Sequence, residues 1–128
     1  MKHAQLVFAK IRPEIYKLIE SGEKTWEVRD DSFTTEDDTL APSPTVIQYV
    51  DLHGKALGLW QTDTSEISEF CKRGKDGTLN SGAKRMLAYS GVDETTFRNL
   101  FNLEHTLVLH GVRLVRKLNS LTDLTDEE

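Results

Sequence analysis

The sequence predicts an α+β protein, in which five or six mostly antiparallel strands form a small barrel-like sheet with about three short helices beside it. Three observations lead to this prediction. Short apolar segments with strand-like patterning recur along the chain. One amphipathic helix lies near the start, and two short helical segments follow later. The short strands are interleaved with these helices, which suggests a small, curved or barrel-like sheet.

The length of 128 residues indicates one domain over residues 1–128. Sixteen basic and 21 acidic residues give a net charge of −5, which disfavours a dedicated duplex-DNA-binding domain because such domains are strongly basic. No run of about 18 apolar residues is available to cross a membrane. The start of the chain does not resemble a secretory signal and only one cysteine is present, so we expect a cytoplasmic protein. An acidic tail at about 119–128 is expected to be flexible.

The first third of the chain predicts a strand, a helix and a second strand. Gln5–Ala9 is short and apolar, as in a buried strand. A helix is expected over Pro13–Ser21, since proline fits a first helical turn and Gly22 fits the position that follows a helix. Lys24–Arg29 alternates as a strand does. Asp30–Pro44 is acidic and contains two prolines, which predicts a solvated loop.

The central part of the chain predicts two further strands, Thr45–Val50 and Ala56–Thr62, joined by a tight turn. The pattern of Thr64–Cys71 fits either a strand or a helical turn. Lys72–Ser81 carries three basic residues and two glycines, which predicts a mobile loop.

The last third predicts two short helices and a long strand. The helices are expected at about Ala83–Tyr89 and Glu94–Phe101, with Asp93 as the N-cap of the second. The strand is expected over Thr106–Leu118, with a bulge or bend near Gly111, where the alternation slips.

The segment Gly22–Arg29 carries the most specific chemical pattern. It brings Lys24, Glu27 and Arg29 within a few residues of one another, with one net positive charge. Such a group is suited to hold a phosphate and to position a base or sugar, with Glu27 orienting either cation. The alternative is a solvated strand face with incidental ion pairs, which the residue pattern alone favours because exposed charges are common.

The pattern Gly-x-Lys-x-x-Glu-x-Arg after an amphipathic helix resembles the signature of the ASCH domain, a branch of the PUA-like superfamily. The four fixed positions are matched by Gly22, Lys24, Glu27 and Arg29. The resemblance covers Leu6–Arg29 and extends more weakly through Ala56–Trp60. It implies a small PUA-like β-barrel with flanking helices, and a cleft beside the motif suited to RNA or a nucleoside-like ligand.

The family resembled here contains proteins of different activity. Most members are presumed RNA-binding modules, and some are ribonucleases. A related group of acetylcytidine amidohydrolases uses a Lys-Thr-x-Thr-x-Arg motif with the second threonine as nucleophile. Thr25 matches the first threonine, but the second position is Glu27, and a carboxylate is a poor replacement for an activated hydroxyl.

The resemblance therefore implies a module that binds RNA, a nucleotide or a nucleoside. Its expected ligand-binding residues are Gly22, Lys24, Thr25, Glu27 and Arg29. The first alternative is an enzyme that acts on RNA or a modified nucleoside, with Lys24 and Glu27 as acid and base. The second is a protein-interaction module, which the net charge of −5 favours because an acidic body repels phosphate.

A second candidate site is the basic segment between residues 72 and 85, which contains five cations and one anion. It suits either contact with a nucleic-acid backbone or an ordinary exposed loop. Its cations are Lys72, Arg73, Lys75, Lys84 and Arg85. The four histidines lack ligand spacing, so no metal site is predicted, and no fingerprint of a cofactor site occurs. The sequence leaves the oligomeric state open.

The aromatic residues and the cysteine suggest less specific roles. Trp26 and Trp60 are assigned to the core, whereas Tyr49 and Tyr89 are candidates for stacking against a base. Cys71 precedes two basic residues, so it is either a reactive thiol or, as is more common, a plain buried one.

Overall fold

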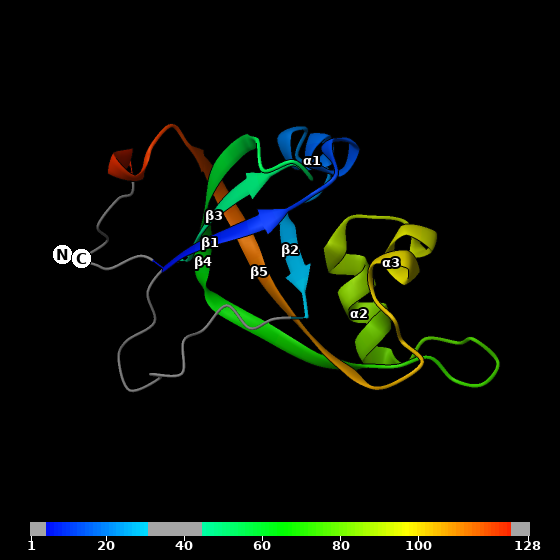
Figure 1. Ribbon diagram of the computed structural model, residues 1–128. Helices are drawn as coiled ribbons and strands as arrows, with labels where there is room; N and C mark the ends of the chain where they lie inside the picture. Colours follow the sequence, from blue (N-terminus) through cyan, green and yellow to red (C-terminus); the bar gives the residue numbers. More distant parts are fainter. Residues whose placement is uncertain (1–4, 31–44, 124–128) are drawn as a thin grey trace.

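The computed structural model describes residues 5–30 and 45–123, which form a curled sheet with helices packed beside it (Figure 1). The elements in chain order are β1 (Gln5–Lys10), α1 (Pro13–Glu20), β2 (Trp26–Arg29), β3 (Thr45–Val50), β4 (Ala56–Cys71), α2 (Ser81–Ser90), α3 (Glu94–Leu100), β5 (Leu107–Leu118) and a final 3-10 turn, η1 (Leu121–Asp123). The predicted loop over Asp30–Pro44 falls outside the described residues from position 31 onward, as do the last five residues of the acidic tail.

The sheet has the strand order β1-β3-β4-β5-β2. β1 pairs with β3 in parallel, and the three other pairings are antiparallel. These observations confirm the predicted α+β class with five mostly antiparallel strands and three helices. Within the described residues, however, β1 and β2 are edge strands that do not pair with each other, so the sheet curls without closing into the expected barrel.

The long hairpin of β4 and β5 buries opposite faces at its two ends. Towards its C-terminal end, β5 places Val112 and Leu114 in a core with β1, α1 and β3. Towards its start, Leu109 lies in a second core with α2 and α3. Successive side chains of a strand point to opposite faces. Leu109 therefore packs on one face of β5, whereas Val112 and Leu114 pack on the other.

The irregularities of the β4–β5 pairing lie away from Gly111, where we expected a bulge or bend. The register shifts between Gln61 and Thr62, where β5 carries one extra residue, and again between Thr62 and Glu66, where β4 carries two. Gly111 itself pairs regularly with Ile67 and Val28. Its missing side chain has a packing role instead, since a Cβ there would lie 3.3 Å from Met86 Cε.

Three segments differ from or refine the sequence predictions. The ambiguous stretch Thr64–Cys71 continues β4 as a strand. The predicted mobile loop is tied down by an isolated bridge between Arg73 and Leu79, and Leu79 is buried. The start of the expected flexible tail forms η1, where Asp123 Oδ2 accepts the Asn119 backbone N–H at 2.9 Å.

The predicted N-cap of α3 is confirmed, because the Asp93 carboxylate accepts the Thr96 backbone N–H at 2.7 Å. Cys71 is fully buried, and burial raises the pKa of its thiol to about 11. A plain buried thiol is therefore the correct interpretation of Cys71. None of the helices in the described ranges is long and apolar enough to cross a membrane.

Gly58→Ala is expected to destabilise the protein, because a Cβ at this position of β4 would overlap the Tyr16 hydroxyl oxygen. Tyr16 is buried and accepts a hydrogen bond from Trp60 Nε1 at 3.1 Å, so it has little room to move. Overpacking of this kind costs about 1–3 kcal/mol. Urea denaturation of the variant measures the cost.

Tyr16→Phe provides the internal control for this substitution because it removes the oxygen that the new methyl group meets. In the double variant, the loss of unfolding free energy is expected to be smaller than the sum of the two single losses. Strictly additive losses would mean that Gly58 is required for a reason other than its contact with Tyr16.

Candidate functional site

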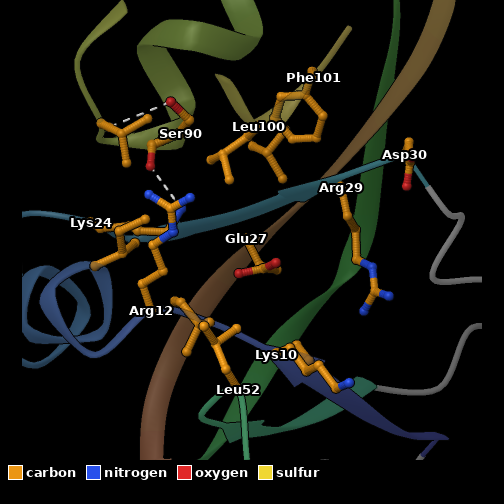
Figure 2. A pocket seen from close by; sticks show the side chains of 15 residues that line it. Lys10, Arg12, Lys24, Glu27, Arg29, Asp30, Leu52, Ser90, Leu100 and Phe101 are labelled. Atoms are coloured by element: carbon orange, nitrogen blue, oxygen red, sulfur yellow. Dashed lines mark hydrogen bonds between the residues drawn. The ribbon is translucent and has the colours of Figure 1, made fainter. Parts of the chain in front are cut away.

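A pocket of about 300 Å³ lies where the curled sheet fails to close, between the edge strands β1 and β2 (Figure 2). The start of α1, the turn between β3 and β4, and the C-terminal ends of α2 and α3 complete its wall. Its charged lining residues are Lys10, Arg12, Lys24, Glu27, Arg29 and Asp30. Four cations and two anions give this pocket a net positive charge inside an acidic protein.

Lys24 lies at the floor of the pocket, where the residue is only 6% exposed. Its ammonium group donates hydrogen bonds of 2.7 Å to the carbonyl oxygens of Trp26 and Ser90. Ser90 is the last residue of α2, so the cation caps the negative end of that helix. Burial lowers the pKa of Lys24 below its ordinary value, and the nearby Glu27 carboxylate opposes that shift. A lysine ammonium has three donors, so two carbonyl partners leave capacity for a ligand.

The chain closes tightly around Lys24 because of two glycines. Gly22 ends α1 with a φ of 85°, a left-handed conformation that glycine adopts without strain. Gly91 ends α2 in the same way with a φ of 70°. A Cβ at Gly91 would also lie 2.9 Å from Lys24 Cα, so this glycine permits the close approach of α2 to β2.

Glu27 is held in place by Tyr49 from β3. The Tyr49 hydroxyl donates a 2.7 Å hydrogen bond to Glu27 Oε1 across the inside of the curled sheet. Burial and the Glu27 charge raise the pKa of Tyr49 well above its ordinary value, so it remains a donor. A carboxylate accepts several hydrogen bonds, and Glu27 therefore retains capacity to accept one from a ligand. Lys24 and Glu27 together present a donor beside an acceptor.

The mouth of the pocket carries apolar groups on opposite sides (Figure 2). Leu52, in the turn after β3, is 63% exposed, and Leu100, at the end of α3, is 47% exposed. Phe101 lies beside Leu100. Large apolar side chains that remain exposed around a polar pocket are typical of a binding site.

The structure brings together three of the five residues predicted for the motif site. Lys24, Glu27 and Arg29 line the pocket. The exposed residues Gly22 and Thr25 are not among its lining residues, and the contribution of Gly22 is the turn into β2.

The loop part of the basic segment, residues 72–80, lies at the far end of the β4–β5 hairpin (Figure 1). Lys84 and Arg85 lie in the first half of α2, whose last residue, Ser90, lines the pocket. Lys72, Lys75 and Lys84 are exposed. The two arginines form ion pairs, Arg73 with Glu104 at 3.2 Å and Arg85 with Glu69 at 3.1 Å. Whether this segment contacts a nucleic-acid backbone stays a prediction.

Several pocket residues were not identified from the sequence. Lys10 and Arg12 flank the junction of β1 and α1 without any distinctive pattern, and Leu52, Ser90 and Leu100 come from segments far apart in the chain. The other missed lining residues are Ala9, Ile11, Ile15, Val28, Asp30, Val92 and Phe101.

The aromatic residues also depart in part from the sequence interpretation. Tyr49 was a candidate for stacking on a base, and this interpretation is wrong because the residue is fully buried. Tyr89 is 36% exposed, and its ring packs on Trp26 with centroids 4.6 Å apart. Trp60 is half-buried against the core that contains Val112.

The polar side chains of the described residues form no cluster of three histidine, cysteine, aspartate or glutamate residues that could hold a metal ion. The pocket presents one buried lysine, one oriented carboxylate, the carboxylate of Asp30 and three further cations.

The comparisons with known proteins identify the fold. The chain resembles the crystal structure of an ASCH protein from Zymomonas mobilis, with a TM-score of 0.58, 14% sequence identity, and coverage of 88% of this chain and 68% of the other. A serine-to-alanine variant of that protein gives a TM-score of 0.58 and 17% identity, with coverage of 93% and 77%. A tyrosine-to-phenylalanine variant gives 0.52 and 16%, with coverage of 90% and 76%. The sequence matches no family model and no curated protein.

These structures show that the chain has the fold of an ASCH domain, as its resemblance to that family implied. At 14–17% identity, the likeness establishes the fold alone. The identity of a ligand must therefore be argued from the pocket.

The ammonium group of Lys24 is expected to lose its proton at a lower pH than an ordinary lysine, and Glu27→Gln is expected to lower the midpoint further. The reason is that burial disfavours the charged form, whereas the Glu27 carboxylate favours it. A pH titration followed by side-chain NMR of lysine measures both midpoints. Glu23→Gln changes an exposed carboxylate nearby and serves as the control. An unchanged or higher midpoint in Glu27→Gln would show that the carboxylate does not act on Lys24.

Proposed function

We propose that this chain, which has the fold of an ASCH domain, binds single-stranded RNA by taking one nucleotide into the pocket between β1 and β2. The observation that carries the proposal is the pairing of a buried donor, Lys24, with an oriented acceptor, Glu27, at the floor of a positively charged pocket. A volume of about 300 Å³ is at the small end for ligand pockets and suits one nucleotide better than a folded macromolecule.

The floor favours a nucleobase edge over a phosphate. A phosphate offers only acceptors and carries negative charge, so the Glu27 carboxylate would repel it. A base edge that offers an acceptor beside a donor matches Lys24 and Glu27 at the same time. The phosphate then belongs near the mouth, where Lys10 and Arg12 are exposed cations. The apolar groups of Leu52 and Leu100 contact the faces of the base or sugar.

The acidic character of the whole protein is compatible with this function. The net charge of −5 is distributed over the chain, whereas the pocket carries two more cations than anions. Local attraction at short range outweighs distant repulsion because exposed charges beyond about 10 Å are screened at 0.1 M salt. Binding by this route weakens as salt is added, which distinguishes it from an apolar protein interface.

Glu27→Gln is expected to weaken the binding of a nucleoside and of its monophosphate, whereas Arg12→Gln is expected to weaken the monophosphate alone. Loss of a hydrogen bond to a charged group costs roughly 1.5–3 kcal/mol, which corresponds to about 10- to 150-fold in affinity. Titration calorimetry with the four nucleosides and their 5′-monophosphates measures these affinities.

Two exposed residues close to the site provide matched controls, Glu23→Gln for the acidic variant and Lys17→Gln for the basic one. Neither is expected to change binding by more than about twofold, since surface charges contribute little. The proposal is overturned if Glu27→Gln and Glu23→Gln bind equally well, or if neither nucleotides nor short RNA bind at about millimolar concentration.

A second candidate function is an enzyme that acts on RNA or a modified nucleoside. The observation in its favour is that burial lowers the pKa of Lys24, which brings a lysine closer to the range useful for acid–base chemistry. Glu27 lies beside it with its orientation fixed by Tyr49. In this case Lys24 and Glu27 act as the acid–base pair on the bound base or its substituent.

For such an enzyme, Lys24→Met and Glu27→Gln are each expected to reduce turnover by about 10²- to 10⁴-fold, as is typical of general acid–base residues. Product formation from an RNA oligomer and from a panel of modified nucleosides is followed by chromatography. Circular dichroism verifies that each variant is folded, and Glu23→Gln serves as the control. Binding without any product across the panel would favour the binding module instead.

A further inference from the structure

We propose that a shelf beside the pocket, on the inner face of the curled sheet, is a second subsite that takes the phosphate and base of the next nucleotide in an RNA strand. The shelf consists of Arg29 of β2, His110 and Val108 of β5, and Ser68 and Phe70 of β4. The inference rests on the proposed RNA-binding function and adds to it a direction and a length for the bound strand.

The strand pairing places these side chains in two adjacent rows on one face. Arg29 pairs with His110, and His110 pairs with Ser68, while Val108 pairs with Phe70. Residues directly opposite one another in an antiparallel pair share a face, as do residues two positions apart along a strand. Val112 follows His110 by two positions and lies in the core inside the curl, so the shelf continues that inner face outward.

The first row is polar and joins the pocket directly. Arg29 lines the pocket and lies opposite His110 in the ladder. Ser68 Oγ and His110 Nδ1 are 2.7 Å apart, which fixes the orientation of the ring. An arginine, a histidine and a hydroxyl in one row supply several hydrogen-bond donors, the set that a phosphate needs.

Two acidic residues, Glu27 and Glu66, lie in the neighbouring row on the same face, one on each side of Val112. Glu66 Oε1 lies 3.6 Å from His110 Nδ1, and both side chains are largely buried, at 13% and 16% exposure. The serine and the carboxylate both approach Nδ1, so Nε2 takes part in neither contact. The arrangement therefore resembles an oriented histidine that presents its second nitrogen to a ligand.

The second row is apolar and exposed, which is unusual on an inner face. Phe70 is 70% exposed, and Val108, directly opposite, is 37% exposed. An accessible aromatic ring beside a row of phosphate-binding groups is the arrangement by which proteins hold successive bases of a single strand. An apolar protein segment would fit Phe70 and Val108, but it would leave the polar row unmatched.

The shelf also connects the two sites found in the sequence. The row of Val112 and Glu27 lies four positions along β5 from the row of Val108, a distance of about 13 Å. The basic segment begins at Lys72, two residues after Phe70. An RNA strand that leaves the pocket along the shelf therefore runs towards positive charge.

The test compares the affinity of a nucleoside 5′-monophosphate with that of a mixed-sequence RNA trinucleotide. The native protein is expected to bind the trinucleotide roughly tenfold more tightly, as base stacking and a phosphate contact allow. Phe70→Ala and His110→Gln are each expected to abolish most of this gain without changing the affinity for the monophosphate. Phe8→Ala is the matched control, because Phe8 is a similarly exposed phenylalanine, at 64%, on edge strand β1.

A second readout does not depend on the variants. In the native protein, the NMR signals of Phe70 and Val108 are expected to shift with the trinucleotide but not with the monophosphate. The shelf is ruled out if the monophosphate binds in a Glu27-dependent manner but the trinucleotide binds with no higher affinity. That outcome leaves the proposed function intact. It is also ruled out if Phe8→Ala and Phe70→Ala weaken the trinucleotide equally. Failure of both ligands to bind removes the proposed function and the shelf together.

Discussion

The buried ammonium group of Lys24 is the interaction on which the site depends. It joins β2 to the C-terminal end of α2 through two short hydrogen bonds, and so connects elements that are 66 residues apart in the chain. A buried cation is costly unless it is paired, and here two carbonyl oxygens, the helix dipole and Glu27 supply the compensation. The position of Glu27 is fixed in turn by Tyr49. The floor of the pocket is thus a consequence of satisfying one buried charge.

The open edge of the sheet explains why a pocket exists at this place. A closed barrel would pair β1 with β2 and fill the space between them. Among residues 5–30 and 45–123 the two strands remain edges, and the side-chain hydrogen bond from Tyr49 to Glu27 spans the interior instead. The long hairpin adds a second core with α2 and α3, which brings Ser90 and Leu100 to the same opening. Edge strands with unpaired backbone are a liability, and charged residues such as Lys10 on β1 protect them.

Much of the fold could be predicted from the sequence because it is encoded locally. The capping residue Asp93 and the glycine after α1 mark helix ends, and they lie where the sequence placed them. The extension of β4 to Cys71 was ambiguous because its side chains serve two different layers, so a single alternation does not describe it. The same change of layer in β5 produced the slip that we attributed to a bulge at Gly111.

Only the part of the site that is contiguous in the sequence could be predicted. Lys24, Glu27 and Arg29 lie within six residues and share a motif, whereas Arg12, Leu52 and Leu100 meet them only after the chain has folded.

Tyr49 also shows that the sequence alone does not reveal which residues meet after folding. Its residue type suggested a surface that stacks on bases, but tertiary packing places it in the core as the group that orients Glu27. A tyrosine with a polar partner at its tip is equally suited to both roles, and only the fold distinguishes them.

The separation of charge in this molecule also bears on specificity. A site that relied on phosphate contacts alone would bind any nucleic acid, since backbone contacts carry no sequence information. The Lys24–Glu27 pair instead places a hydrogen-bond acceptor among cations. This acceptor weakens the attraction for phosphate at the floor of the pocket and favours a ligand that offers a matching donor. Under the proposed function, the carboxylate would thus reduce the general affinity for polyanions and increase discrimination among bases. The acidic net charge and the small, mixed-charge pocket are the reason for proposing recognition of one nucleotide in a single strand and not unselective binding of nucleic acid.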